Sequence, residues 1–264
     1  MAKRTKRGAD PEGRMSFGQH LIELRKRITR AALSIVVASI AGWFLADFVL
    51  GALRAPITAL AEASGRTAEL NYTGLTEGFD VKMQVTITLG VIISSPVWLY
   101  QIWAYIVPAL KRNEKKYALG FLGTAIPLFL LGCAAGWLVF PHTVQLLTQF
   151  GAEGTTSILG TKAYVDFVMK LVLAIGVGFV LPVFLVLLNF IGLMSARTIL
   201  KGWRIAVLLI TLFAAIATPS SDVVTMFLLA IPMVALYFAA AGVAWIHDRG
   251  VVKRANRLAA EIAV

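Results

Sequence analysis

The chain has 264 residues, of which 58% are apolar and 15% charged, and its mean hydropathy is +0.79. This composition excludes an ordinary soluble domain, because soluble chains carry about 25% charged residues. The lone Cys133 lies in an apolar run, which excludes a disulfide framework and a thiolate metal site. A net charge of +11 would indicate nucleic-acid binding in a soluble protein. In a membrane protein it more simply reflects orientation, so we expect no nucleic-acid partner.

An amphipathic helix is predicted directly before the first apolar run. Its apolar stripe, at helical spacing, consists of Phe17, Leu21, Leu24 and Ile28. Such a helix would lie in the membrane interface and continue into the first span. Glu23 is a single carboxylate beside the cations at 25–27.

Six apolar runs follow, and about 20 apolar residues are needed to cross a bilayer. They cover residues 28–46, 85–107, 117–140, 167–190, 203–217 and 223–246. Proline occurs within four of them, at Pro96, Pro127, Pro182 and Pro232. Proline removes a backbone hydrogen bond and tends to bend a helix, although membrane helices also tolerate it. We therefore predict an all-α membrane protein, with six transmembrane helices in a curved bundle, as a single membrane domain over residues 1–264.

The second run ends in a segment typical of a membrane–water boundary. Its aromatic residues are Trp98, Tyr100, Trp103 and Tyr105. Pro108 then breaks the helix, and the basic loop 111–116 follows. Aromatic side chains at headgroup depth followed by lysine and arginine mark the exit of a span. Glu114 is a single carboxylate among the four cations of this loop, which suggests that a cationic group binds there.

Lysine and arginine are distributed unequally between the two sides of the predicted membrane. Of the 25, 20 lie in the N-terminal segment, the 111–116 loop, the region 197–204 and the C-terminal tail. The other five lie in or beside the loops 47–84 and 141–166, where we expect only short helices or turns. The positive-inside rule places the larger group in the cytoplasm. We predict a multi-pass protein of the cytoplasmic membrane with basic cytoplasmic tails, 1–27 and 247–264.

Four motifs occur along nearly the whole chain. They are HLIELRKR (His20–Arg27), SPVWLYQIW (Ser95–Trp103), the loop from Pro108 to Glu114, and TPSSD (Thr218–Asp222). In this order and with six spans, they resemble the TatC family, the receptor subunit of the twin-arginine protein translocase. The resemblance implies binding of signal peptides with paired arginines, and export of folded proteins driven by the proton-motive force. It implies TatA- and TatB-type single-span subunits and other copies of the chain as partners, with no catalytic residue, metal or cofactor.

The resemblance also implies where the signal peptide binds. Glu23 and Glu114 match two glutamates of the family, and a carboxylate is the geometric match of a guanidinium group. The other matching positions, which would shape the site, are Arg25, Gln101, Tyr105, Pro108 and Leu110. Asp222, in the TPSSD motif, is a further candidate acid.

Each of these carboxylates also has a purely structural explanation. Glu114 follows Asn113, a good N-cap, so its charge would favour the dipole of the third span. Glu23 is spaced to pair with Arg27 on the same helix, four residues later. Asp222 fits the first turn of the last helix equally well.

Two positions depart from the family pattern. Val180 and Phe238 stand where family members often carry an acid, so a role of those acids is not transferred to this chain.

The resemblance also implies where partner subunits bind. Family partner subunits pack along the last two spans, here 205–217 and 226–240. The small residues 239–242 permit close helix approach, although packing against lipid explains them equally well.

Two other classes of protein share this topology. A proton-coupled transporter usually places ionisable residues at mid-membrane, whereas Asp47, Asp166 and Lys170 fall near span ends. An intramembrane hydrolase requires a nucleophile and a base, and none of the three histidines belongs to a recognisable catalytic motif. A translocase receptor without catalytic activity is therefore the favoured interpretation.

Overall fold

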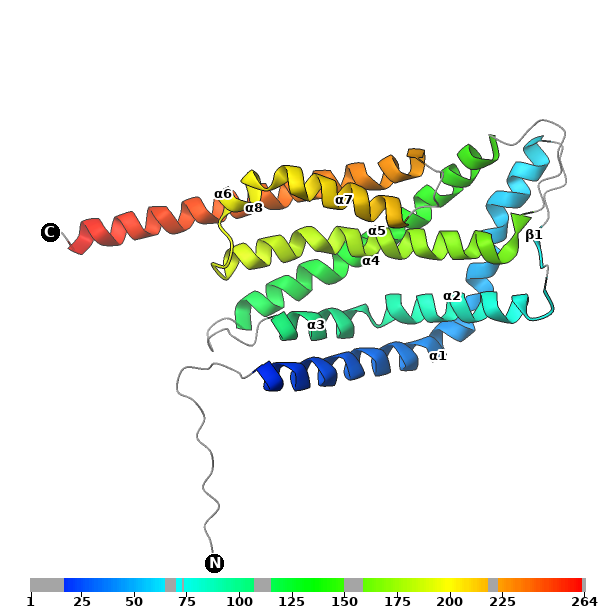
Figure 1. The fold of residues 1–264 in the computed structure, drawn as a ribbon, viewed down its shortest axis with the longest axis horizontal. Helices are drawn as coiled ribbons and strands as arrows, with labels where there is room; N and C mark the ends of the chain where they lie inside the picture. The colour runs from blue at the N-terminus through cyan, green and yellow to red at the C-terminus, as the bar shows by residue number, and fades with distance from the viewer. Residues whose placement is uncertain are drawn as a thin grey trace, which may run out of the picture.

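The computed structural model describes residues 17–64, 70–72, 74–106, 115–149, 159–217 and 223–262. Helices contain nearly all of these residues (Figure 1). They are α1 (Phe17–Ser64), α2 (Glu77–Ile93), α3 (Ser95–Ile106), α4 (Lys115–Gln149), α5 (Thr161–Phe190), α6 (Ala196–Lys201), α7 (Trp203–Ala217) and α8 (Val223–Ile262). Two strands of two residues each, β1 (Leu70–Asn71) and β2 (Leu159–Gly160), pair in parallel at one end of the bundle.

Four of the described helices, α1, α4, α5 and α8, are each long and apolar enough to cross a membrane. Helices α2 and α3 pass the same test as a pair, although they are bent by 59° at the break between them. Helix α7 is apolar but has only 15 residues. At a rise of 1.5 Å per residue it is about 22 Å long, against roughly 30 Å of hydrocarbon. The all-helical membrane architecture is thus confirmed, whereas the full set of six spans stays a prediction.

The second predicted span is not one continuous helix, which corrects the expectation for 85–107. Helix α2 ends at Ile93, and α3 begins at Ser95. Pro96 explains the break, because its ring disfavours helical backbone before it and its missing N–H is harmless in a first turn. The Trp98 indole N–H instead donates to the carbonyl of Val91 across the bend, at 2.9 Å. The other three prolines singled out above lie inside α4, α5 and α8.

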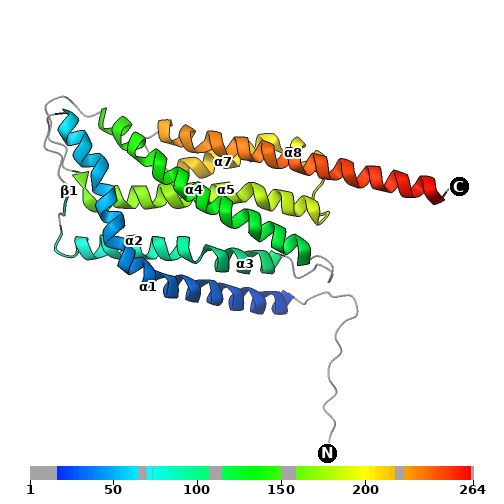
Figure 2. The ribbon, with the colours of Figure 1, turned by 180° about the vertical axis from the view of Figure 1, so that it is seen from behind.

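Three helices extend well beyond the apolar runs. Helix α4 continues past residue 140 to Gln149, within the predicted loop 141–166. Helix α1 continues to Ser64, so the expectation of only short helices or turns from residue 47 onward is wrong for 47–64. Leu53 and Ile57 on this extension are buried in the core, which explains why the helix persists. Helix α8 continues to Ile262, so most of the predicted C-terminal tail is helical. This extension projects past the rest of the bundle (Figures 1 and 2).

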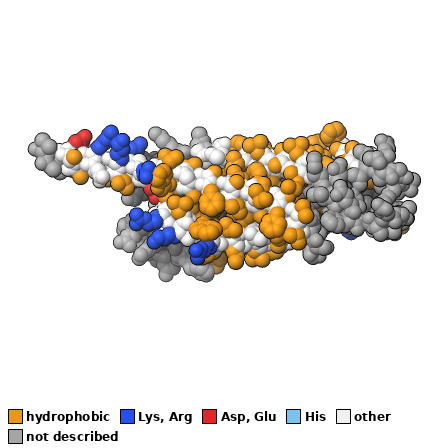
Figure 3. Space-filling view, turned by 90° about the horizontal axis from the view of Figure 1, so that it is seen from above, with side chains coloured by type: hydrophobic (Ala, Val, Ile, Leu, Met, Phe, Trp, Pro, Cys, Tyr) orange, Lys and Arg blue, Asp and Glu red, His pale blue; other side chains and the backbone are white. Residues whose placement is uncertain are grey.

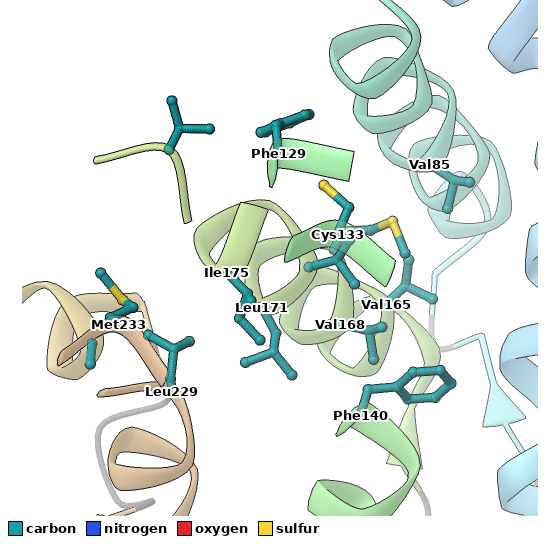
Figure 4. Close-up of a cluster of buried hydrophobic side chains, with 14 of the residues drawn as sticks. Val85, Phe129, Cys133, Phe140, Val165, Val168, Leu171, Ile175, Leu229 and Met233 are labelled. Atoms are coloured by element: carbon teal, nitrogen blue, oxygen red, sulfur yellow. The ribbon is translucent and has the colours of Figure 1, made fainter. Parts of the chain in front are cut away.

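The core lies where α4 and α5 cross. A Cβ added to Gly132 would be 2.8 Å from the Cα of Gly176, so the two backbones meet where both residues lack a side chain. Figure 4 shows Phe129 and Cys133 of α4 above the α5 side chains, and Met233 of α8 to the left of them. Small residues thus bring the helices together, and large apolar side chains fill the space around them.

Cationic side chains gather at one end of the bundle. Figure 3 shows Lys and Arg beside the α8 extension and a broad apolar band over the middle of the molecule. At the opposite end, three lysines form ion pairs: Lys82 with Asp47, Lys162 with Asp80, and Lys170 with Asp166. The cations therefore separate along the bundle axis as the sequence predicts.

Candidate functional site

An ion pair lies near the start of α1, at the cation-rich end. The Glu23 Oε1 atom accepts hydrogen bonds from Arg27 Nε at 3.0 Å and from Arg27 Nη2 at 2.6 Å. Only about a fifth of either side chain is exposed, at 21% for Glu23 and 20% for Arg27. The spacing of four residues that permits this pair was the structural explanation offered for Glu23, and the structure contains the pair.

The same arginine connects α1 to α3. Arg27 Nη1 donates to the Oε1 atom of Gln101 at 3.4 Å, between residues 74 positions apart in the chain. Two turns earlier on α1, the His20 ring stacks on the Tyr105 ring with centroids 4.5 Å apart. Three predicted site residues, Glu23, Gln101 and Tyr105, therefore lie along one contact between the two helices.

The second oxygen of Glu23 has a different environment. Its Oε2 atom is buried and has no hydrogen-bond partner among the described residues. A buried carboxylate oxygen without a donor is unfavourable, since a carboxylate in water accepts several hydrogen bonds. The carboxylate thus has one oxygen bonded to Arg27 and a second, buried oxygen with no donor among the described residues.

The remaining predicted site residues fall into two groups. Arg25 is described, and its side chain is exposed on α1. Glu114, Pro108, Leu110 and Asp222 lie outside the described residues.

Sequence reasoning did not assign His20 and Arg27 to the site. Both belong to the HLIELRKR motif, and with Glu23 they are spaced three and four residues apart, which places all three on one face of a helix. That spacing was the available signal. The partners on α3 had no such signal, because the contact joins segments far apart in the chain.

Neither position that departs from the family pattern carries a polar side chain into the bundle. Val180 of α5 is buried, with 3% of its surface exposed. Phe238 of α8 is 45% exposed, and its ring packs edge-on against Tyr237 at 5.5 Å. Both positions contribute apolar surface only.

A family model and curated relatives all indicate the same protein family. The family model for the Sec-independent protein translocase protein TatC matches residues 19–232. The TatC protein of Xylanimonas cellulosilytica is 44% identical over 250 residues, which cover 95% of this chain and 89% of the relative. The TatC protein of Rothia mucilaginosa is 37% identical over 258 residues, covering 97% and 87%.

A solved structure is also similar. The crystal structure of the twin-arginine translocase receptor TatC in DDM matches with a TM-score of 0.75 at 30% identity, covering 85% of this chain and 99% of that chain. The chain therefore belongs to the TatC family, whose members are membrane-embedded components of Tat protein transport and not catalytic enzymes.

Proposed function

We propose that this chain is the receptor and core subunit of a twin-arginine translocase. It binds signal peptides that carry paired arginines, and it exports folded proteins across the cytoplasmic membrane with the proton-motive force. TatA- and TatB-type single-span subunits and other copies of the chain complete the complex. The matching crystal structures are described as twin-arginine translocase receptors, which supports this role.

The observation that carries the proposal is the unsatisfied Oε2 atom of Glu23. Arg27 bonds only Oε1, so the carboxylate keeps one acceptor for a second guanidinium group, which has to enter the buried space around Oε2. The partial burial of the Glu23 side chain makes such a bond more valuable than an exposed salt bridge, which contributes about 0–1 kcal/mol. A buried acceptor also favours arginine, whose planar fork holds its donors in a fixed geometry.

Glu114 supplies the second carboxylate in this proposal. Two adjacent arginines require two anionic partners, and Glu114 follows α3, the helix that contacts Glu23 through Arg27 and Gln101. Arg25, Tyr105, Pro108 and Leu110 shape the surroundings of the site. The stacked rings of His20 and Tyr105 provide a flat aromatic wall between α1 and α3.

The proposed topology has six spans and two cytoplasmic termini. The gathering of cations at the end of the bundle that holds Glu23 supports this orientation. The amphipathic start of α1 lies at the cytoplasmic interface in this arrangement. Helix α7 completes the set as the fifth span, and the bilayer thins locally beside it, since short spans are accommodated in this way.

The outer faces of α7 and α8 are the proposed contact for the single-span subunits. Ile205, Leu208 and Ile216 on α7 are each at least 65% exposed. On α8, Gly242 is exposed and an added Cβ would meet nothing within 4 Å. A smooth apolar face of this kind permits close approach of another membrane helix.

Site-specific crosslinking to a twin-arginine signal peptide tests the receptor assignment. We expect Glu114→Gln to weaken crosslinking about 10- to 150-fold, since losing a charge-assisted hydrogen bond costs roughly 1.5–3 kcal/mol. Glu23→Gln should act in the same direction less severely, and Glu114→Arg should abolish crosslinking. Export should fall in parallel while the amount of inserted protein stays normal.

Asp47→Asn provides a matched control, because it removes one carboxylate from an ion pair at the opposite end of the bundle. Crosslinking should be unchanged in this variant. A twin-lysine signal peptide should lose less affinity than a twin-arginine one on Glu114→Gln, since lysine makes no bidentate contact. Normal crosslinking in the Glu23→Gln, Glu114→Gln double variant would contradict the proposed site.

A further inference from the structure

A large groove lies at the cation-rich end, away from the contact between α1 and α3 that holds Glu23. It is formed by α6, the start of α7 and the extension of α8. Its volume is about 1430 Å³. Six cationic side chains line it: Arg197, Lys201, Arg204, Arg249, Lys253 and Arg257. None of the residues assigned above to signal-peptide binding belongs to this groove.

The positive charge of the groove is not neutralised within the part of the chain that the structure describes. None of the six cations has a carboxylate within ion-pairing distance there. Asp248 also lines the groove, but both of its oxygens are engaged. Oδ1 accepts from Asn189 Nδ2 at 2.9 Å, and Oδ2 accepts from the backbone N–H of Ala196 at 2.7 Å. The groove thus has a surplus of donors suited to an anion.

The floor of the groove is held in place by contacts between α6 and α8. The Asp248 carboxylate fixes the first residue of α6 to α8, and the Tyr237 hydroxyl donates to the carbonyl of Ile199 at 2.5 Å. Ala196, Ile199 and Ala241 are buried between these helices. The arginines and lysines of α6 and α8 therefore project from two helices with a defined separation.

Two tryptophans indicate the depth of the groove in the membrane. Trp203 and Trp245 line it and are 44% and 43% exposed. Arg249 lies 3.4 Å above the Trp245 ring, and Arg204 lies 5.7 Å from the Trp203 ring. Exposed tryptophan beside arginine is typical of the headgroup level. Below it, Ile205 and Leu208 of α7 present an apolar surface to acyl chains.

We propose that this groove binds the phosphate headgroup of an anionic phospholipid from the leaflet at the cation-rich end. Arginine forks match phosphate oxygens bidentately, and basic pockets between membrane helices at this level suit anionic headgroups. The lipid is favoured over a soluble anion because charge, interfacial tryptophans and an acyl-chain surface coincide at one place. An orientation signal alone would need only the number of cations, and not their convergence on one groove.

The extension of α8 fits the same ligand. Arg249, Lys253 and Arg257 lie on the face toward the groove, at a spacing of four residues. This row extends the basic lining of the groove along α8, which continues past the end of the bundle as one helix to Ile262 (Figure 1).

Lipid retention by the purified full-length chain, measured by native mass spectrometry in detergent, tests this proposal. We expect dioleoylphosphatidylglycerol to be retained in preference to dioleoylphosphatidylcholine. The Arg204→Gln, Arg249→Gln double variant should weaken phosphatidylglycerol binding roughly 30-fold, at about fivefold for each cation removed near the surface. Arg204→Lys, Arg249→Lys should retain most of the binding, which separates loss of charge from misfolding.

The matched control is Lys162→Gln, Lys170→Gln, which removes the same charge at the opposite end and should leave binding unchanged. Glycerol 3-phosphate added as a soluble competitor should not displace the lipid. Equal weakening in both Gln double variants would overturn the proposal, because it would indicate dependence on net charge alone. Displacement by glycerol 3-phosphate or by a stoichiometric acidic peptide would overturn it as well. Twin-arginine peptide crosslinking should be unaffected by Arg204→Gln, Arg249→Gln.

Discussion

Replacing Arg27 with Gln separates the two roles that Glu23 can have. If Glu23 serves only to hold Arg27, then Arg27→Gln and Glu23→Gln remove the same interaction and should have the same effect. If Glu23 binds a signal-peptide arginine, Glu23→Gln removes the acceptor, whereas Arg27→Gln makes a second carboxylate oxygen available. Only Glu23→Gln should then lower the affinity for the peptide.

The magnitudes follow from the contacts of the pair. Helical pairs at this spacing contribute about 0.3–0.5 kcal/mol. Two hydrogen bonds to one oxygen and partial burial raise the value here to at most roughly 1 kcal/mol. Both substitutions should therefore lower stability slightly, and Arg27→Gln by somewhat more, because it also removes the bond to Gln101. Peptide binding should fall in Glu23→Gln by about 10-fold, the lower end of the range given for Glu114→Gln, because a charge-assisted bond is lost. In Arg27→Gln it should be unchanged or a few-fold stronger.

The assay is the fluorescence anisotropy of a labelled twin-arginine signal peptide titrated with each purified variant in detergent. The thermal midpoint of each variant, recorded in parallel, verifies that the two remain equally folded. A fall in affinity of similar size in both variants would refute the reasoning. It would assign Glu23 to the internal ion pair and leave Glu114 as the only carboxylate of the proposed site.

Three further predictions concern topology, partner binding and packing. In a Cys133→Ala background, a cysteine placed at Ser64 should react with an impermeant thiol reagent in intact cells, and a cysteine placed at Asn256 should not. The reverse labelling pattern would invert the proposed orientation. Gly242→Leu should reduce copurification of a single-span partner without lowering the amount of this chain, and unchanged copurification would remove α8 from the proposed contact. Gly176→Leu should lower the thermal midpoint in detergent, since even its Cβ would lie 2.6 Å from the Cys133 sulfur and overpacking costs about 1–3 kcal/mol. An unchanged midpoint would indicate that α4 and α5 separate easily.

Hydropathy and charge predicted much of the architecture, since both act locally along the chain. The predicted fifth run, 203–217, has the bounds of α7, and the predicted fourth run ends with α5 at Phe190. A bilayer requires continuous apolar segments, so each span is encoded in its own 20 or so residues. The motifs that indicated the TatC family are local in the same sense. Within one of them, Glu23 stands out by its charge alone, because the residues beside it in the sequence are cationic or apolar.

The tertiary structure decided what depends on contact between distant segments. Hydropathy gave no sign that α1 continues to Ser64, because that part is stabilised by burial of Leu53 and Ile57 against other helices and not by lipid. The bond from Arg27 to Gln101 joins positions 74 residues apart, and the basic groove requires α6 to lie against α8. A sequence specifies which side chains can bind an anion or a cation. Only packing decides which of them converge and which oxygen, such as Oε2 of Glu23, has no donor among the described residues.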